Sequence, residues 1–184
     1  MSQIAFSSIP TWARPGVSAD DTELPPLSGR SYILLGVGAA TGDGLRRWVD
    51  ALPDEIALRT LTFDDADSAA QALRDELWRA RVGVRLVIVA PAGAALALRG
   101  VATSAGLEDD EIHVTTVGAG AIEIFCSHCR AITSAVAAVD DIVDCGGCDR
   151  HLLVYHHVSR RSGRYLGFMV DAEASPPTAG GSQS

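Results

Sequence analysis

Apolar positions in the middle of the chain follow two alternating periods. Four segments have the apolar pattern of strands: residues 32–35, 56–63, 84–90 and 111–115. Between them, apolar residues recur at helical spacing, and we expect the first helix to begin near Thr41 or Asp43 and to stop at Pro53. Strands that are largely apolar and alternate with helices predict a parallel sheet covered by helices, three layers thick.

This pattern divides the chain into parts. We expect residues 31–117 to form a small doubly wound, Rossmann-like α/β domain, because strands and helices alternate throughout. From residue 121 onward, short β-like runs stand beside cysteine pairs, which predicts a second module over residues 121–171. A module of about 50 residues buries only a small core and usually needs a disulfide or a bound metal ion for stability. The proline-bearing residues 1–30 are expected to be an irregular arm, and the low-complexity residues 172–184 a disordered tail.

The charged residues exclude several functions. The chain has a net charge of -8, and its 15 basic side chains are all arginine. Without lysine, a Schiff-base enzyme and a P-loop nucleotide-binding protein are excluded. An acidic balance disfavours a general nucleic-acid binder, because it repels the phosphate backbone. No apolar run approaches the roughly 20 residues of a membrane span, and the N-terminus has no secretory-signal pattern, so we expect a cytoplasmic protein with reduced cysteines.

The cysteines give the sharpest chemical signal in the sequence. They form two CxxC pairs separated by 15 residues, Cys126 with Cys129 and Cys145 with Cys148. At this spacing, four thiolates can converge on one ion about 2.3 Å away, which predicts a four-cysteine metal site. Two redox-active or disulfide-forming CxxC pairs are the alternative. Four thiolate ligands leave no open position for a substrate, so the ion is expected to be structural or electron-carrying.

The identity of the ion decides what the module does. Zinc would act as a folding staple, whereas iron among four thiolates would carry one electron. Iron-binding knuckles of the rubredoxin type usually have glycine after the second cysteine, but Arg130 and Asp149 occupy those positions here. The sequence therefore favours zinc, with iron as the alternative, in a zinc-ribbon or rubredoxin-like β module.

Basic residues are concentrated after the second cysteine pair. Residues 150–167 contain three histidines, no acidic residue and four arginines, namely Arg150, Arg160, Arg161 and Arg164. Arginine favours bidentate pairing with carboxylate or phosphate, so these four are candidate partner-binding residues. The alternative is a solvated face whose arginine stems pack on the small sheet.

Residues 124–169 resemble the C-terminal domain of the DmmA-type subunit of bacterial dimethylamine monooxygenase. The resemblance is carried by three motifs: Phe125–Cys129, Cys145–Leu152, and His157–Arg161 followed by Tyr165–Phe168. It implies membership in a multi-subunit enzyme that converts dimethylamine to methylamine and formaldehyde with O₂ and electrons from NADPH. It also implies two partners, a catalytic oxygenase subunit with its iron and a reductase subunit with flavin and an iron–sulfur cluster.

The N-terminal domain looks like the nucleotide-binding half of ferredoxin-reductase-type flavoproteins. The matching segments are the turn over Leu34–Gly38 and the strand over Leu86–Pro91. Such reductases have Cys-Gly before this proline, where the present chain has Val89 and Ala90. Gly36 and Gly38 are the candidate cofactor-binding residues, and close packing of a helix on a strand is the alternative role of the turn.

The sequence contains no recognisable active site of its own. It has no evident histidine–carboxylate iron triad and no nucleophile with a paired base. We therefore expect an accessory, electron-transfer or scaffolding subunit that is not catalytic alone. A stand-alone zinc-ribbon adaptor that binds protein or nucleic acid is the first alternative. A small independent nicotinamide-binding reductase is the second, and it predicts NADPH affinity at Gly36 and Gly38.

Overall fold

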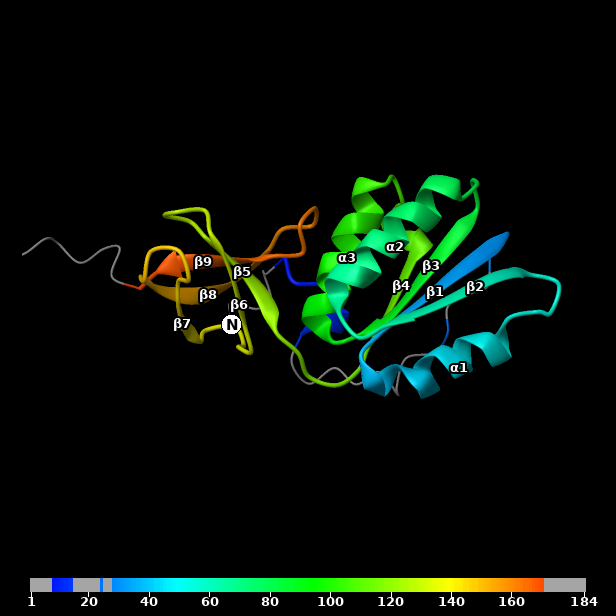
Figure 1. Cartoon of the computed structure of the whole chain (residues 1–184), viewed down its shortest axis with the longest axis horizontal. Coiled ribbons are helices and arrows are strands. Elements are labelled where there is room, and N and C mark those ends of the chain that lie inside the picture. Colours follow the sequence, from blue (N-terminus) through cyan, green and yellow to red (C-terminus); the bar gives the residue numbers. More distant parts are fainter. Residues whose placement is uncertain (1–7, 15–23, 25–27, 171–184) are drawn as a thin grey trace, which may run out of the picture.

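The computed structural model describes residues 8–14, 24 and 28–170 and contains two sheets that follow each other along the long axis of the molecule (Figure 1). The elements of the first part are β1 (Ser31–Val37), α1 (Gly42–Ala51), β2 (Ala57–Phe63), α2 (Ala66–Arg79), β3 (Val84–Ala90), α3 (Ala92–Ser104) and β4 (Ile112–Thr116). Those of the second part are β5 (Ile122–Cys126), β6 (Ile132–Ala135), β7 (Ile142–Asp144), β8 (His151–Val158) and β9 (Tyr165–Met169). Short 3-10 helices cover η2 (Thr11–Ala13), η4 (Ala39–Thr41) and η5 (Asp109–Glu111).

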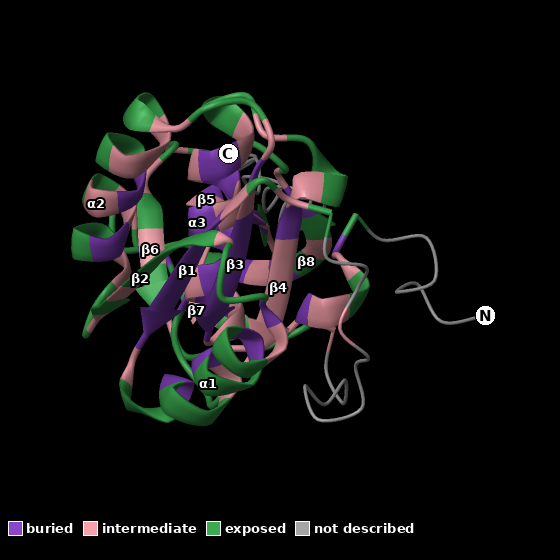
Figure 2. Cartoon of the chain, turned by 90° about the vertical axis from the view of Figure 1, so that its right-hand side faces the viewer, coloured by how far each residue is buried: buried purple, intermediate pink, exposed green. Residues whose placement is uncertain are grey.

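The first sheet, called sheet A, is parallel throughout, with the strand order β2-β1-β3-β4. The helix α1 covers one face and the helices α2 and α3 cover the other (Figure 1). Alternate side chains of β1 enter different cores: Leu34 packs in the cluster of Trp48 from α1, and Leu35 in the cluster of Leu73 from α2. Figure 2 shows that burial is concentrated in the central strands β1 and β3. The expected parallel α/β sheet is confirmed.

Local sequence explains where α2 begins and how closely α1 packs on the sheet. Asp65 caps α2, because its side chain accepts a hydrogen bond from the N–H of Ser68 at 2.8 Å. The helix α1 lies close to the sheet because Gly44 has no side chain; a Cβ there would lie 2.8 Å from Cγ1 of Val89. Within the described residues, no helix combines the length and the apolar character needed to cross a membrane.

The second sheet, called sheet B, is mixed, with the strand order β6-β5-β9-β8-β7. Three of its pairs are antiparallel, and β5 pairs with β9 in parallel. Its inner face carries a core of its own that includes Ile124 of β5 and the pair Leu152 and Val154 of β8. The chain reverses at the first cysteine pair, between β5 and β6, and at the second, between β7 and β8, and these two turns bring the thiols together.

The two sheets are joined by close backbone packing against α3. A Cβ at Gly100 would lie 2.6 Å from the carbonyl oxygen of Arg161, and one at Gly163 would lie 2.3 Å from that of Leu96. The side chain of Leu96 enters the core of sheet B. Asp109 adds a polar contact, since its carboxylate accepts hydrogen bonds from Arg99 of α3 and from Arg160 of the β8–β9 loop.

Residues 8–14 differ from the irregular arm expected over residues 1–30. Ile9 and Ala13 are buried in the core of sheet B, and the Ser8 hydroxyl donates to the carbonyl of Val158 at 3.0 Å and accepts from its N–H at 2.7 Å. Thr116 of β4 donates through Oγ1 to the carbonyl of Trp12 at 3.3 Å. The segment therefore contacts both sheets. The remainder of the expected arm, apart from residues 24 and 28–30, and the expected tail lie outside the described residues.

Candidate metal centre and neighbouring cavity

The four cysteine sulfurs converge at the end of sheet B. All four Sγ atoms lie within 4.8 Å of one another, with 3.5 Å between Cys129 and Cys145 and 3.9 Å between Cys126 and Cys148. A tetrahedral ion with sulfur ligands at about 2.3 Å would separate the sulfurs by about 3.8 Å. All four cysteines are free, and both of these close pairs join one CxxC turn to the other. The donor set therefore fits one tetrahedral ion better than two separate redox disulfides.

Two equivalent turns position the thiols. In the first, the N–H of Arg130 donates to the carbonyl of Cys126 at 2.9 Å; in the second, the N–H of Asp149 donates to that of Cys145 at 2.9 Å. Arg130 has a φ of 66° and Asp149 a φ of 55°, so both adopt the left-handed conformation that glycine favours. These are the positions at which the sequence departs from iron-binding knuckles, and the departure leaves the geometry of the turns intact.

Hydrogen bonds from the backbone of the turns shift the pKa values of the thiols. The N–H of Gly147 donates to Sγ of Cys145 at 3.4 Å and is the main cause that lowers the pKa of Cys145 to about 6. The N–H of Arg150 lowers the pKa of Cys148, but burial and the three neighbouring thiols outweigh it and raise that pKa to about 12. Adjacent thiolates repel one another, so the cluster needs a cation before all four can ionise.

The cluster offers four ligands and no more. Among the described residues, these cysteines are the one group of three or more His, Cys, Asp or Glu side chains placed to hold an ion. The histidine pair lies toward the far end of β8 from the cysteine turns, where Nδ1 of His157 lies 3.2 Å from the Ser8 hydroxyl and the ring of His156 contacts Tyr155. A closed four-thiolate site can hold the fold together or pass one electron, but it cannot bind a substrate directly.

The two glycines at the end of β1, Gly36 within the strand and Gly38 after it, have different environments. A Cβ at Gly36 would lie 2.8 Å from Cδ1 of Leu45, so this glycine allows α1 to pack on the strand. Gly38 has a φ of +88° and nothing within 4 Å of a Cβ position, and it lines an open cavity. Cofactor binding at Gly36 and Gly38 stays a prediction, and only Gly38 has room for a ligand beside it.

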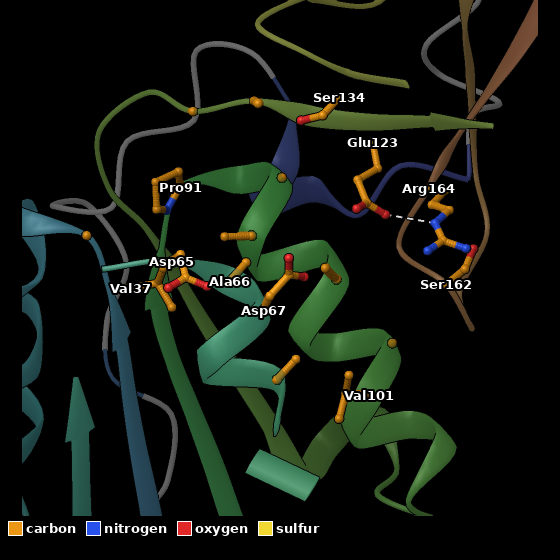
Figure 3. A pocket seen from close by; sticks show the side chains of 18 of the residues that line it. Val37, Asp65, Ala66, Asp67, Pro91, Val101, Glu123, Ser134, Ser162 and Arg164 are labelled. Carbon is orange, nitrogen blue, oxygen red and sulfur yellow. Dashed lines mark hydrogen bonds and ion pairs between the residues drawn. The ribbon is translucent and has the colours of Figure 1, made fainter. Parts of the chain in front are cut away.

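That cavity, of about 1000 Å³, lies between the helices α2 and α3 and sheet B, beyond the carboxyl ends of β1 and β3 (Figure 3). Its charged lining is mixed, with four carboxylates and three guanidinium groups: Asp64, Asp65, Asp67, Glu123, Arg74, Arg161 and Arg164. Glu123 accepts a hydrogen bond from Arg164 at 2.7 Å. The sequence did not predict this cavity, because it forms only where the two halves meet. The signal available beforehand was the position of Gly38 and Pro91 at strand ends.

The structure does not bring the four candidate arginines together. Arg150 precedes β8 and the other three follow it, and a strand of eight residues separates them by about 25 Å. Arg160 pairs with Asp109 and Arg164 with Glu123 inside the chain. Arg150 and Arg161 are exposed. Partner binding by these arginines stays a prediction, and the ion pairs leave Arg150 and Arg161 as the freer two.

Comparison with known proteins identifies relatives. A family model of the C-terminal domain of DmmA-like dimethylamine monooxygenase subunits matches residues 123–168. The chain is also similar to the heme-dependent oxidative N-demethylase delta subunit of Ectopseudomonas mendocina (strain ymp), with 31% identity over 152 residues that cover 81% of this chain and 83% of that protein. No solved structure matches. The resemblance of the C-terminal part is thus confirmed, whereas the reductase resemblance of the N-terminal half stays a prediction.

Proposed function

Because the chain belongs to the DmmA-like family of dimethylamine monooxygenase subunits, we propose that it is an accessory subunit of a multi-subunit oxidative N-demethylase. The observation that carries the proposal is the similarity over 83% of the length of a protein that is itself named a delta subunit. The closed donor set supports it, because four thiolates leave no coordination position at which an amine or O₂ could react.

The proposed reaction of the whole complex is the demethylation of dimethylamine. Dimethylamine, O₂, NADPH and a proton give methylamine, formaldehyde, NADP⁺ and water. In this proposal a separate oxygenase subunit carries out the chemistry, and a reductase subunit with flavin and an iron–sulfur cluster supplies the electrons. The present chain organises these subunits. A reaction that consumes NADPH, together with thiols that are kept reduced, fits a cytoplasmic location.

For the four-cysteine site we propose zinc as a structural ion held by Cys126, Cys129, Cys145 and Cys148. Bound there, zinc would neutralise the thiolates and fix the two turns to each other. A haem does not fit this site, because four sulfurs within 4.8 Å of one another enclose a single ion and leave no room for a macrocycle. The haem in the name of the relative is therefore proposed to reside on another subunit.

Reconstitution of the enzyme tests the accessory role. The other subunits are purified and assayed for dimethylamine-dependent NADPH oxidation and formaldehyde release, with and without this chain. We expect the chain alone to be inactive and its omission to lower the activity of the mixture at least about tenfold, because an organising subunit raises the local concentration of its partners. Full activity without the chain would contradict the proposal.

A further inference from the structure

Sheet B has a second apolar face in addition to its core face. Side chains alternate along each strand, so the residues between the core positions point to the outer face. Six of these outer residues are large and apolar, and we call them the outer apolar rows: Phe125, Ile132, Ile142, Leu153, Leu166 and Phe168. None of the six is part of a core cluster of the described residues.

The strand register aligns these six side chains across all five strands. Phe125 of β5 lies opposite Ile132 of β6 and beside Leu166 of β9. Leu153 of β8 then lies opposite Phe168 of β9 and Ile142 of β7. Neighbours at these positions are about 5 Å apart, so their side chains touch. The rows form one continuous surface rather than scattered apolar residues.

This surface is exposed and carries little net charge. Ile142 is 58% exposed, and Phe168 and Ile132 are each 44% exposed. At one end Glu123 pairs with Arg164, and at the other the carboxylate of Asp144 lies 2.6 Å from Nδ1 of His151. A contiguous apolar patch without a cluster of unpaired basic side chains favours an apolar protein surface over a nucleic acid or an anionic membrane.

The size of the rows indicates what kind of partner would cover them. Five strands at about 4.8 Å spacing span about 20 Å, and the two rows occupy about 10 Å along the strands, so the patch measures about 200 Å². A stable two-chain interface buries about 800 Å² per partner. A dimer of this chain through the patch alone would therefore be weak. Of the segments outside the described ranges, residues 171–184 contain no leucine, isoleucine, valine, methionine or aromatic residue, whereas residues 1–7 contain Met1, Ile4 and Phe6.

The patch continues directly into the cavity between sheet B and α3. Glu123 and Ser134, which face each other on β5 and β6, lie on the same outer face and line that cavity together with Arg164 (Figure 3). A partner segment that lies over the rows and enters the cavity of about 1000 Å³ would bury far more area than the rows alone.

We infer that the outer apolar rows are the docking surface for an apolar segment of another subunit of the N-demethylase, and that the adjoining cavity, with its charged lining, takes up the polar end of that segment. The inference depends on the proposed accessory function, since it assigns the surface by which that function is exercised. It differs from docking through the four candidate arginines, because the apolar rows contain none of them and only Arg161 and Arg164 line the adjoining cavity. The rows lie next to the cysteine turns, because Phe125 precedes Cys126 and Phe168 follows Gly167, which pairs with Cys126.

Binding of full-length variants to the purified other subunits tests the docking surface. Ile142→Glu and Phe168→Glu place a carboxylate that would be buried in the interface, so we expect each to weaken binding at least about tenfold. Phe168→Leu keeps the surface apolar and is expected to bind within about threefold of wild type. Val82→Glu is the matched control, because Val82 is 97% exposed but lies at the opposite end of the molecule, in the α2–β3 loop.

The outcomes separate this inference from the function on which it depends. Binding by wild type that changes less than about threefold between about 50 and about 500 mM NaCl, and that only the two row variants lose, supports the inference. Wild-type strength in both row variants, an equal loss in Val82→Glu, or steep salt dependence overturns it while leaving the accessory function intact. A wild-type homodimer that Phe168→Glu dissociates would assign the rows to a second copy instead. Failure of wild type to bind any subunit would overturn the proposed function itself.

Discussion

His113 shows how a single residue couples the fold to pH. Its imidazole lies on β4 and stacks on the indole of Trp48, with 5.4 Å between ring centroids. Burial lowers the pKa of His113, the charge of Arg85 lowers it further, and the charge of Asp110 opposes both. The folded chain therefore favours the neutral imidazole more strongly than the unfolded chain does.

This shift predicts that acid weakens the fold through His113. Above pH of about 6.5 the imidazole is neutral in both states and contributes no pH dependence. As the pH falls through about 6.5, the unfolded chain binds a proton that the folded chain resists, and the free energy of unfolding decreases until the lower, folded pKa is passed. Urea denaturation between pH of about 5 and 8 should show a shallower slope for His113→Phe than for wild type. An identical slope in both would mean that His113 does not contribute.

At the scale of elements, the contact between α3 and the β8–β9 loop depends on Gly100 having no side chain. The backbone of the loop passes so close to Gly100 that a Cβ would lie 2.6 Å from the carbonyl oxygen of Arg161. A carbonyl in a packed loop cannot move aside as the end of a flexible side chain can. The glycine thus holds sheet B against the helix, although glycine weakens a helix by itself.

Alanine substitution at two helical glycines separates these effects. Gly100→Ala gains helix propensity but overpacks the contact, and we expect it to lower the free energy of unfolding by about 2 kcal/mol. Gly42→Ala, at the start of α1 with nothing within 4 Å of its Cβ position, should leave stability unchanged or raise it by up to about 1 kcal/mol. Urea titrations of both variants measure the difference. Equal stability would show that the loop can shift.

Elements whose pattern is local could be predicted from the sequence. The strand expected over residues 84–90 is β3, and the helix expected near Thr41 begins at Gly42. The four-cysteine cluster was also predictable, since CxxC spacing fixes the turns. The period of apolar residues shows which side chains of one element face a core. For strands that are buried on both sides, this local pattern is enough to predict the element.

Features that depend on distant contacts could not be predicted in this way. Residues 8–14 are too short for a period, so the burial of Ile9 became apparent only with the core of sheet B. The arginine motif suggested one basic patch, but β8 places its members at opposite ends. The outer apolar rows did have a local signal. Leu152–Tyr155 is apolar at successive positions, so both faces of this strand are apolar, whereas a small module with one core needs apolar residues on one face only.

At the scale of the whole molecule, the chain is proposed to form two folding units, residues 31–117 and 121–171. Sheet A has cores on both faces, whereas sheet B has one core and the cysteine cluster. The two parts are linked by Leu96 of α3, which enters the core of sheet B, and by the close backbone contact at Gly163. The metal is therefore expected to contribute mainly to the stability of sheet B.

Metal removal tests this division. Chelation, or Cys145→Ala, should lower the stability of sheet B by several kcal/mol, because the ligands bind an ion only when the turns are formed. Hydrogen exchange should become fast across β5–β9 while β1 and β3 stay protected. Elemental analysis of the untreated protein should find about one equivalent of zinc, and iron with visible absorption would instead identify an electron carrier. Simultaneous loss of protection in both sheets would contradict the boundary at residues 117–121.

The contact between Ser8 and Val158 also sets an order of events during synthesis. These residues are 150 positions apart, so the ribosome makes the N-terminal segment long before its hydrogen-bonding partner exists. At about 5–20 residues per second, Ser8 and Ile9 wait roughly 8–30 s before β8 is complete. The segment translated early is thus among the last to dock, and its apolar side chains are open to chaperones throughout that interval.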